Sequence, residues 1–236
     1  MTNINNFVIY GERCSGTNYL ENIIKTNFGL ELNTDFGSKH FFCFNNYNKP
    51  LDNTLFIGIV RNPIYWINSL SKELYHIPDE NKSLHNLLFN KYYSVEENTN
   101  NIIIKDINFI TLKKYNNIFE LRKMKNFYLL NVMPKMVKNY ILINYETLLY
   151  NFDYTLDFIK VKFNLTKQFP IYQQITKYKK SESYNFVKQR VILLSEQIVN
   201  TIWDNLHIQQ ENRLGYFKGN NNEYLKDLNN INFITS

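Results

Sequence analysis

The sequence predicts an α/β fold, a three-layer sandwich with a central parallel sheet flanked by helices. Short apolar runs alternate with segments of helical periodicity, which is the pattern of βαβ units. The strongest run, Thr54–Val60, is continuously apolar, as expected of a strand that is buried on both faces. The chain has 236 residues, of which 44% are hydrophobic, so it can bury a sizeable core. With no internal repeat and no Gly/Ser-rich linker, one domain over residues 1–236 is predicted.

The first half of the chain opens with a strand over residues 7–10. A helix follows from Thr17 to about residue 27, because apolar residues recur at helical spacing and Gly29 suits the position just after a helix. The aromatic run at residues 40–44 predicts a short strand. After Thr54–Val60, Pro63 fits the first turn of a helix that is expected to reach about residue 75.

The second half is predicted to be mostly helical. One strand is expected at Tyr140–Asn144, and helices are expected at 83–93, 118–137, 152–163 and 184–206. Pro134 would kink the second of these helices. The last ~20 residues are predicted to be a loosely held tail.

The composition narrows the classes of partner. The net charge is +6 and the pI about 9.0, which favours anionic ligands. Only residues 177–180 form a dense basic run, so a nucleic-acid partner is not expected. Cys14 and Cys43 match neither a metal-ligand pattern nor a disulfide framework. No signal peptide or membrane span is evident, which predicts a soluble, cytoplasmic protein without a membrane partner. The sequence does not indicate an oligomeric state.

The most informative segment is FVIYGERCSGTN, at residues 7–18. A buried strand that runs into a small polar loop and a helix N-terminus is a device for binding phosphate-like anions. Ser15 and Thr17 offer hydroxyl donors, Gly16 permits close approach of the backbone, and Arg13 can donate two hydrogen bonds to an oxyanion. The loop lacks the Gly-Lys-Ser/Thr ending of a nucleotide triphosphate loop. The alternative is a simple Ser/Thr cap on a tight turn.

A second anion site is predicted at the end of the strongest strand. Arg61 stands at its carboxyl end, where ligands bind in open α/β sheets. Ser69 lies eight positions later, about two turns into the next helix. The alternative is an ordinary Arg at a strand end and a solvated Ser. Two anion sites on neighbouring strands suggest a ligand with two phosphate centres.

These segments resemble the family of sulfotransferases that use 3′-phosphoadenosine 5′-phosphosulfate (PAPS). That family carries a loop of the type Arg or Lys, any residue, Ser-Gly-Thr after its first strand, and a strand-end Arg with a Ser eight positions later. Residues 144–149 (NYETLL) are similar to a third motif. The resemblance covers about the first 150 residues. It implies a P-loop-like fold in which the phosphosulfate is bound by Arg13, Cys14, Ser15, Gly16, Thr17 and Asn18, and the 3′-phosphate by Arg61 and Ser69.

The loop departs from the family pattern at one position. Many members carry a Lys directly before Ser-Gly-Thr, and here that position is Cys14. The loop resembles a subgroup that reads GERCSGTN, in which we expect Arg13 to supply the cation. Cys14 is either a redox-sensitive thiol or, as we favour, a packing residue. The family's C-terminal basic loop is not evident, although residues 177–180 or Arg213 are candidates to replace it.

Transfer of a sulfuryl group to a hydroxyl needs a proton acceptor, and His suits this task at neutral pH. Lys39-His40 resembles the family's catalytic segment, so His40 is the predicted base, with a half-buried structural His as the alternative. Lys39 would assist the sulfuryl oxygens, but adjacent strand residues point to opposite faces. Glu146 is predicted to fix a helix start or a loop, and Trp66 to be a core residue.

The resemblance implies an enzyme that moves the sulfuryl group of PAPS to an acceptor hydroxyl and releases adenosine 3′,5′-bisphosphate (PAP) without a metal. The acceptor would be a carbohydrate or another small molecule, bound by loops expected at ~76–135 and ~165–190. A P-loop nucleotide kinase, or a non-catalytic nucleotide-binding protein with the same fold, are the alternatives. The sequence does not name the acceptor.

Overall fold

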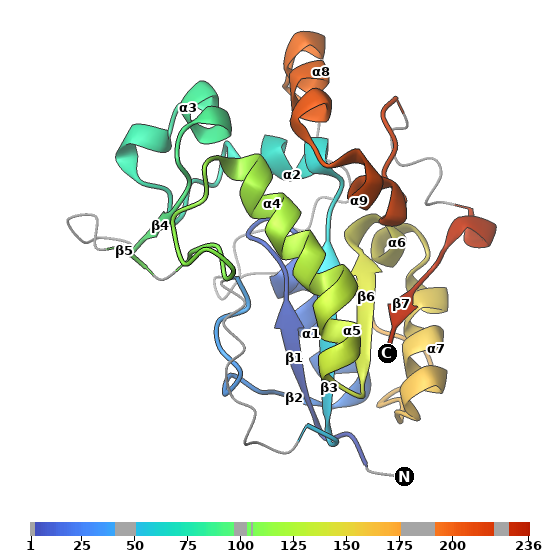
Figure 1. The fold of residues 1–236 in the computed structure, drawn as a ribbon. Coiled ribbons are helices and arrows are strands. Elements are labelled where there is room, and N and C mark those ends of the chain that lie inside the picture. The colour runs from blue at the N-terminus through green and yellow to red at the C-terminus, as the bar shows by residue number, and fades with distance from the viewer. Residues whose placement is uncertain (1–2, 41–50, 97–102, 105, 176–191, 220–226) are drawn as a thin grey trace.

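The computed structural model describes residues 3–40, 51–96, 103–104, 106–175, 192–219 and 227–236 (Figure 1). Its centre is a five-stranded sheet in the order β2-β1-β3-β6-β7. The strands are β1 (Asn6–Tyr10), β2 (Glu31–Leu32), β3 (Thr54–Val60), β6 (Tyr140–Asn144) and β7 (Ile234–Thr235). The first four are parallel, and β7 runs antiparallel to β6. The prediction of an α/β fold with a mostly parallel sheet flanked by helices is confirmed.

Helices connect these strands, and a small two-stranded sheet stands apart from the main one. The helices are α1 (Thr17–Phe28), α2 (Pro63–Leu70), α3 (Leu84–Phe89), α4 (Ile118–Phe127), α5 (Met133–Met136), α6 (Tyr145–Tyr150), α7 (Phe152–Phe163), α8 (Glu196–Asn205) and α9 (Ile208–Arg213). The small sheet pairs β4 (Ser94–Val95) with β5 (Ile103–Ile104). Among the residues described, no helix is long and apolar enough to cross a membrane.

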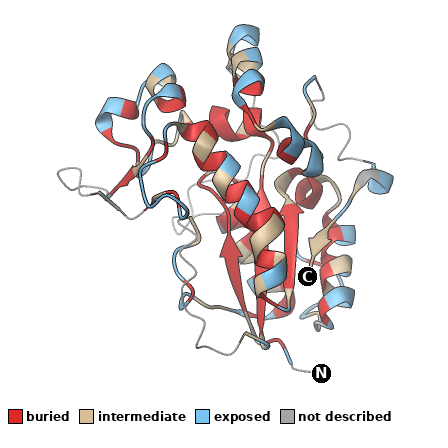
Figure 2. Cartoon of the chain, viewed as in Figure 1, coloured by how far each residue is buried: buried red, intermediate tan, exposed pale blue. Residues whose placement is uncertain are grey.

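The strands supply side chains to two separate cores, one on each face of the sheet. Alternate residues of a strand point to opposite faces, so Phe56 and Val60 of β3 join one core while Ile57 and Ile59 join the other. Helices α2, α4 and α8 contribute to the first core, and α1, α6 and α7 to the second. Buried strands accordingly lie between helices whose outer sides are exposed (Figure 2).

Strand register brings three connections together at one edge of the sheet. Tyr10 pairs with Gly58, and Val60 pairs with Asn144, all in parallel strands. The carboxyl ends of β1, β3 and β6 therefore lie side by side, as Figure 1 also shows. The loop after Tyr10, the residues after Val60 and the start of α6 face one another at this edge, which is where open α/β sheets bind ligands.

Several predicted helices are shorter in the structure. Helix α2 ends at Leu70 rather than near residue 75: the N–H groups of Lys72 and Glu73 both donate to the Ser69 carbonyl, and the Tyr75 carbonyl accepts from Arg13 Nη1 (3.0 Å). Helix α3 covers only Leu84–Phe89 of the predicted 83–93. Of the predicted 184–206, residues 184–191 lie outside the described part, and α8 begins only after its Ser195 cap.

The predicted helix over 118–137 exists but changes type before its end. Residues Tyr128–Val132 form a π-helical turn between α4 and α5. Pro134 has no N–H to donate to the preceding turn, which accounts for a break in the α-helical hydrogen bonding there.

Two sheet-edge features were missed or mispredicted from the sequence. Lys39 and His40 form a turn rather than the start of a strand, and residues 41–44 lie outside the described part. The C-terminus was predicted to be a loose tail, but Ile234–Thr235 pair with β6 as strand β7. Ser236 continues this pairing, because its N–H donates to the Tyr140 carbonyl (3.3 Å). The outer edge of β6 has unpaired backbone groups that such a strand satisfies.

Candidate functional site

The loop between β1 and α1 presents backbone N–H groups at a helix N-terminus. Two residues adopt positive φ, Cys14 (61°) and Gly16 (93°), which curl the chain over the end of β1. Gly16 is the N-cap of α1, and no side chain caps the helix, so the alternative of a Ser/Thr cap does not hold. A Cβ at Gly16 would lie 2.3 Å from Cδ2 of Tyr145, so only glycine fits there. The uncapped first turn can accept an anion.

The hydroxyls of this loop lie inside it. Ser15 and Thr17 are both buried. The Ser15 N–H donates to the Glu12 carbonyl (3.1 Å), which closes the tight turn that precedes the helix. Asn18, the second residue of α1, is exposed at the rim of the loop. Ser15 and Thr17 thus lie buried at the start of α1, and Asn18 is the exposed polar side chain beside them.

Arg61 joins the two predicted anion sites. Its Nη1 donates to the Cys14 carbonyl (2.8 Å) and to Ser69 Oγ (3.0 Å). The guanidinium lies over the ring of Tyr145, 4.8 Å from the ring centroid. Its Nε is buried, and within the described residues it has no hydrogen-bond acceptor. A buried donor without an acceptor is costly, so this atom is a candidate ligand contact.

A second set of buried ionic contacts fixes the backbone around Arg61. Arg122 forms a bidentate pair with Glu211 (both N–O distances 2.7 Å) and donates from Nη2 to the Arg61 carbonyl (2.9 Å). Glu146 accepts from the Asn62 N–H (3.0 Å) and from the Tyr216 hydroxyl (2.8 Å), and burial raises the pKa of Glu146. Glu146 therefore fixes a loop, which is the structural role predicted for it.

The Arg13 guanidinium is bonded to protein groups and does not point its donors at the end of α1, although Arg13 was predicted to supply the cation there. Its side chain is buried, and each guanidinium nitrogen has a protein acceptor: Glu12 for Nε (3.3 Å), the Tyr75 carbonyl for Nη1 (3.0 Å) and the Tyr92 hydroxyl for Nη2. Burial alone would lower the pKa of Arg13, but Tyr92 and the nearby carboxylates raise it. Arg13 therefore holds a positive charge beneath the loop.

The Arg13 backbone is also held in place. Trp66 Nε1 donates to the Arg13 carbonyl (2.8 Å), and the Trp66 side chain is fully buried in the core. The predicted core role of Trp66 agrees with this position. Through this hydrogen bond Trp66 also links helix α2 to the loop between β1 and α1, residues 11–16, which is called the anion loop below.

A buried cluster of four charged side chains supports the loop from below. It consists of Glu12, Arg13, Asp106 and Lys125. Lys125 Nζ contacts Glu12 (2.5 Å), Asp106 (3.0 Å) and the His40 carbonyl (2.7 Å). Burial alone would raise the pKa of Glu12, but the charges of Lys125 and Arg13 lower it to about 2. Because 113 residues separate Glu12 from Lys125 along the chain, no local sequence pattern could reveal this cluster.

Lys39 and His40 both contact the anion loop, from a turn rather than a strand. Gly11 N–H donates to the Lys39 carbonyl, and His40 Nδ1 lies 2.9 Å from the Gly11 carbonyl. Since a carbonyl only accepts, Nδ1 carries the proton and the neutral ring keeps its lone pair on Nε2. Burial lowers the pKa of His40 to about 4, so the neutral form prevails at neutral pH. Lys39 Nζ contacts Asn18 Oδ1 (2.5 Å) and Glu21 (3.2 Å).

Cys14 has the environment of a packing residue. Its side chain is partly buried and packs against the core, and burial raises the pKa of its thiol to about 11. Such a thiol is protonated and unreactive at neutral pH, which favours the packing interpretation over a redox role.

The other candidate residues lie away from this site or outside the described part. Residues 177–180 and Cys43 are not described. Arg213 is exposed and its Nη1 donates to Asn131 Oδ1 (2.9 Å). No group of three or more metal-ligating side chains is found in the described ranges.

No protein-family description, no curated protein and no solved structure matches this chain.

Proposed function

We propose that the protein is a sulfotransferase that moves the sulfuryl group of PAPS to an acceptor hydroxyl. The observation that carries the proposal is the contact set of Arg61, which bonds Ser69 Oγ and the Cys14 carbonyl at the same time. Two anion-binding elements that lie 47 residues apart along the chain are thereby held within one guanidinium's reach. PAPS carries two separate phosphate centres on one adenosine, which suits two adjacent sites better than a chain of linked phosphates does.

Each phosphate centre of the cofactor has a proposed partner. The 5′-phosphosulfate lies against the N–H groups at the start of α1, with Ser15, Gly16 and Thr17 around it. The 3′-phosphate accepts from Arg61, whose Nε is available, and from Ser69 Oγ. Arg13 contributes its charge from beneath the loop rather than by direct contact. The side chain of Cys14 makes no polar contact in this arrangement.

The proposed reaction is a single in-line transfer. The acceptor oxygen bonds to sulfur while the bond from sulfur to the bridging phosphate oxygen breaks, and that electron pair leaves with PAP. His40 Nε2 takes the proton of the acceptor hydroxyl. By analogy with phosphoryl transfer, the transition state is loose and its charge lies on peripheral and bridging oxygens. The helix N-terminus and Lys39 would stabilise that charge.

Binding of nucleotides tests the cofactor assignment first. We expect PAP to bind at least about tenfold more tightly than ATP or ADP, because only PAP places one phosphate at each site. Isothermal titration calorimetry without magnesium measures the three affinities. Magnesium-dependent ATP turnover, or ATP binding equal to that of PAP, would favour the kinase alternative and exclude this proposal.

Replacement of His40 tests the proposed base. His40→Ala is expected to slow sulfuryl transfer about 10²- to 10⁴-fold while the affinity for PAP stays unchanged. His40→Asn serves as a second variant, because its amide can still donate to the Gly11 carbonyl but cannot accept a proton. It should be as slow as His40→Ala. An unchanged rate in either variant would exclude His40 as the base and favour a non-catalytic role.

The pH dependence of kcat/KM tests the protonation state of His40 independently of the substitutions. Since burial lowers its pKa from 6.5 to about 4, the base is already deprotonated at pH 6. The wild-type kcat/KM should therefore stay level down to about pH 5 and fall at lower pH, with its midpoint at about pH 4. A midpoint near 6.5 would mean that His40 is solvated in the working enzyme.

A further inference from the structure

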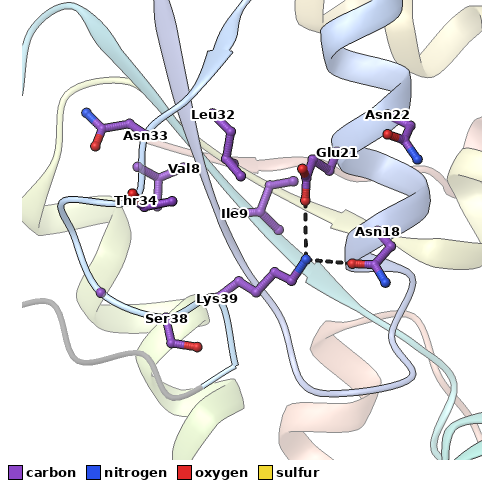
Figure 3. A pocket seen from close by; sticks show the side chains of 11 residues that line it. Val8, Ile9, Asn18, Glu21, Asn22, Leu32, Asn33, Thr34, Ser38 and Lys39 are labelled. Atoms are coloured by element: carbon purple, nitrogen blue, oxygen red, sulfur yellow. Dashed lines mark hydrogen bonds and ion pairs between the residues drawn. The ribbon is translucent and has the colours of Figure 1, made fainter. Parts of the chain in front are cut away.

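A cavity of about 800 Å³ opens beside the anion loop, on the β2 side of β1 (Figure 3). It lies between the first turns of α1 and the connection over residues 33–39, with Lys39 reaching across it toward α1. Its volume is within the usual range for small-molecule sites. Its described lining residues all come from positions 8–39, and none from the described parts of the segments ~76–135 and ~165–190, where acceptor loops were expected.

The cavity exists because β2 leaves the sheet early. Only Asn6 and Phe7 of β1 pair with β2, and the chain returns to the sheet at the hydrogen bond from Gly11 N–H to the Lys39 carbonyl (2.9 Å). Backbone groups of alternate residues point to the same side of a strand, so Ile9 presents its N–H and C=O to this gap. Within the described connection, no residue bonds them. The edge of β1 therefore offers the cavity one backbone donor and one backbone acceptor, both from Ile9, beside the apolar side chains of Ile9 and Leu32.

The walls of the cavity are polar, and their charges cancel. Lys39 Nζ lies 3.2 Å from the Glu21 carboxylate and 2.5 Å from Asn18 Oδ1 (Figure 3). Asn22 and Thr34 add an amide and a hydroxyl that form no hydrogen bond within the described part of the chain. Among the residues that the structure describes, those lining the cavity include no aromatic side chain. A carboxylate next to neutral amides disfavours an anionic ligand. The described lining offers hydrogen-bonding groups rather than a ring on which a flat phenol could stack, which favours a ligand with several hydroxyls.

The cavity adjoins the proposed reaction centre through two of its lining residues. Asn18 is the second residue of the helix whose N-terminus would hold the sulfuryl group. Lys39 directly precedes His40, whose Nδ1 is fixed on the first residue of the anion loop. A ligand in the cavity would approach the loop from the side opposite Arg61 and Ser69. The nucleotide and this ligand would therefore meet at the loop.

We propose that this cavity is the acceptor site and that the acceptor is a neutral polyhydroxylated molecule, a sugar ring or a sugar alcohol. The inference rests on the proposed function. Amide, carboxylate and hydroxyl side chains pair with several vicinal hydroxyls at once. The apolar side chains of Ile9 and Leu32, which lie on the same face of the sheet, cover the C–H face of a ring.

The test is acceptor selectivity together with one substitution in the cavity wall. Transfer from radiolabelled PAPS is measured to methyl β-D-glucopyranoside and methyl β-D-galactopyranoside, and in parallel to 4-nitrophenol and D-glucuronate. The glycosides should be the better acceptors. Asn22→Leu removes the amide and places a stronger helix former than asparagine in α1. It should raise KM for the glycosides by about tenfold or more and leave the affinity for PAP unchanged. Asn200→Leu, at an exposed position of α8, is the matched control.

The outcomes separate this inference from the proposed function. If the wild type binds PAP and transfers sulfate, but prefers 4-nitrophenol or D-glucuronate or is indifferent to Asn22→Leu, the acceptor assignment is wrong while the function stands. If PAP does not bind preferentially, the function itself fails. Saturation-transfer NMR with the two methyl glycosides then reads the cavity directly: a signal that Asn22→Leu abolishes supports the sugar site, and no signal overturns it.

Discussion

Arg61→Ala is expected to weaken the binding of PAP about 30- to 150-fold, which corresponds to a loss of about 2–3 kcal/mol from charge-assisted hydrogen bonds. The reason is geometric. Arg61 Nε is buried without an acceptor among the described residues, and its Nη1 already bonds Ser69 Oγ at 3.0 Å. A 3′-phosphate bound beside them, as proposed, would complete the guanidinium's contacts. Calorimetric titration with PAP and with adenosine 5′-monophosphate measures the effect.

The comparison of two ligands distinguishes contact from structural damage. Adenosine 5′-monophosphate lacks the 3′-phosphate, so the wild type should prefer PAP and Arg61→Ala should lose most of that preference. Ser69→Ala is expected to lose less, because it removes one neutral donor and keeps the charge. Lys123→Ala, at an exposed position of α4, should change neither affinity. If Arg61→Ala weakened both nucleotides equally, Arg61 would support the loop through the Cys14 carbonyl instead of binding the phosphate.

The sheet could be predicted from the sequence because its central strands are continuous apolar runs. Thr54–Val60 and Tyr140–Asn144 match the observed β3 and β6, since burial on both faces leaves no room for polar residues. The two-residue edge strands β2 and β7 carry no such signal, because their pairing depends on a neighbouring strand and not on their own composition. The same reasoning explains the helix boundaries. Helix α2 ends at Leu70, and Tyr75, which the predicted helix would have included, accepts instead a tertiary hydrogen bond from Arg13.

The candidate site also has a part that could be predicted from the sequence and a part that could not. The loop at residues 11–18 and the pair Arg61–Ser69 follow from local order along the chain: each stands directly after a strand or within the next helix, and the structure brings them together. The side-chain environments could not be predicted locally. Arg13 was expected to bind the anion, but Glu12, Tyr92 and Tyr75 surround its guanidinium. Apart from the adjacent Glu12, the partners of the Arg13 guanidinium come from distant segments whose proximity only the fold determines.

Lys125→Met is expected to lower the free energy of unfolding by about 3–5 kcal/mol, because it removes the cation that lies 2.5 Å from the buried Glu12 carboxylate and 3.0 Å from that of Asp106. Of the Glu12 partners in the cluster, only Arg13 would remain, and the His40 carbonyl would lose its donor. Urea denaturation at neutral pH measures the loss. Lys123→Met, two residues earlier on the exposed face of α4, is the control and should stay within about 0.5 kcal/mol of the wild type.

The pairing itself is tested by adding Glu12→Gln to Lys125→Met. Removing the uncompensated carboxylate should recover part of the lost stability, with a coupling free energy of about 0.5–3 kcal/mol between the two positions. If the single variant does not fold, the double variant should.

Acid unfolding tests independently how the Glu12 carboxylate contributes to stability. Glu12 has a lowered pKa in the folded state, so its contribution is present above pH 4.5 and is lost as the pH falls toward about 2. Without Lys125 the pKa of Glu12 rises, and this part of the acid sensitivity should shrink. If Lys125→Met were as stable as the wild type and its acid profile were unchanged, the attraction within the cluster would only offset the cost of desolvating its charges. The loop would then be held by Trp66 and Tyr145 instead.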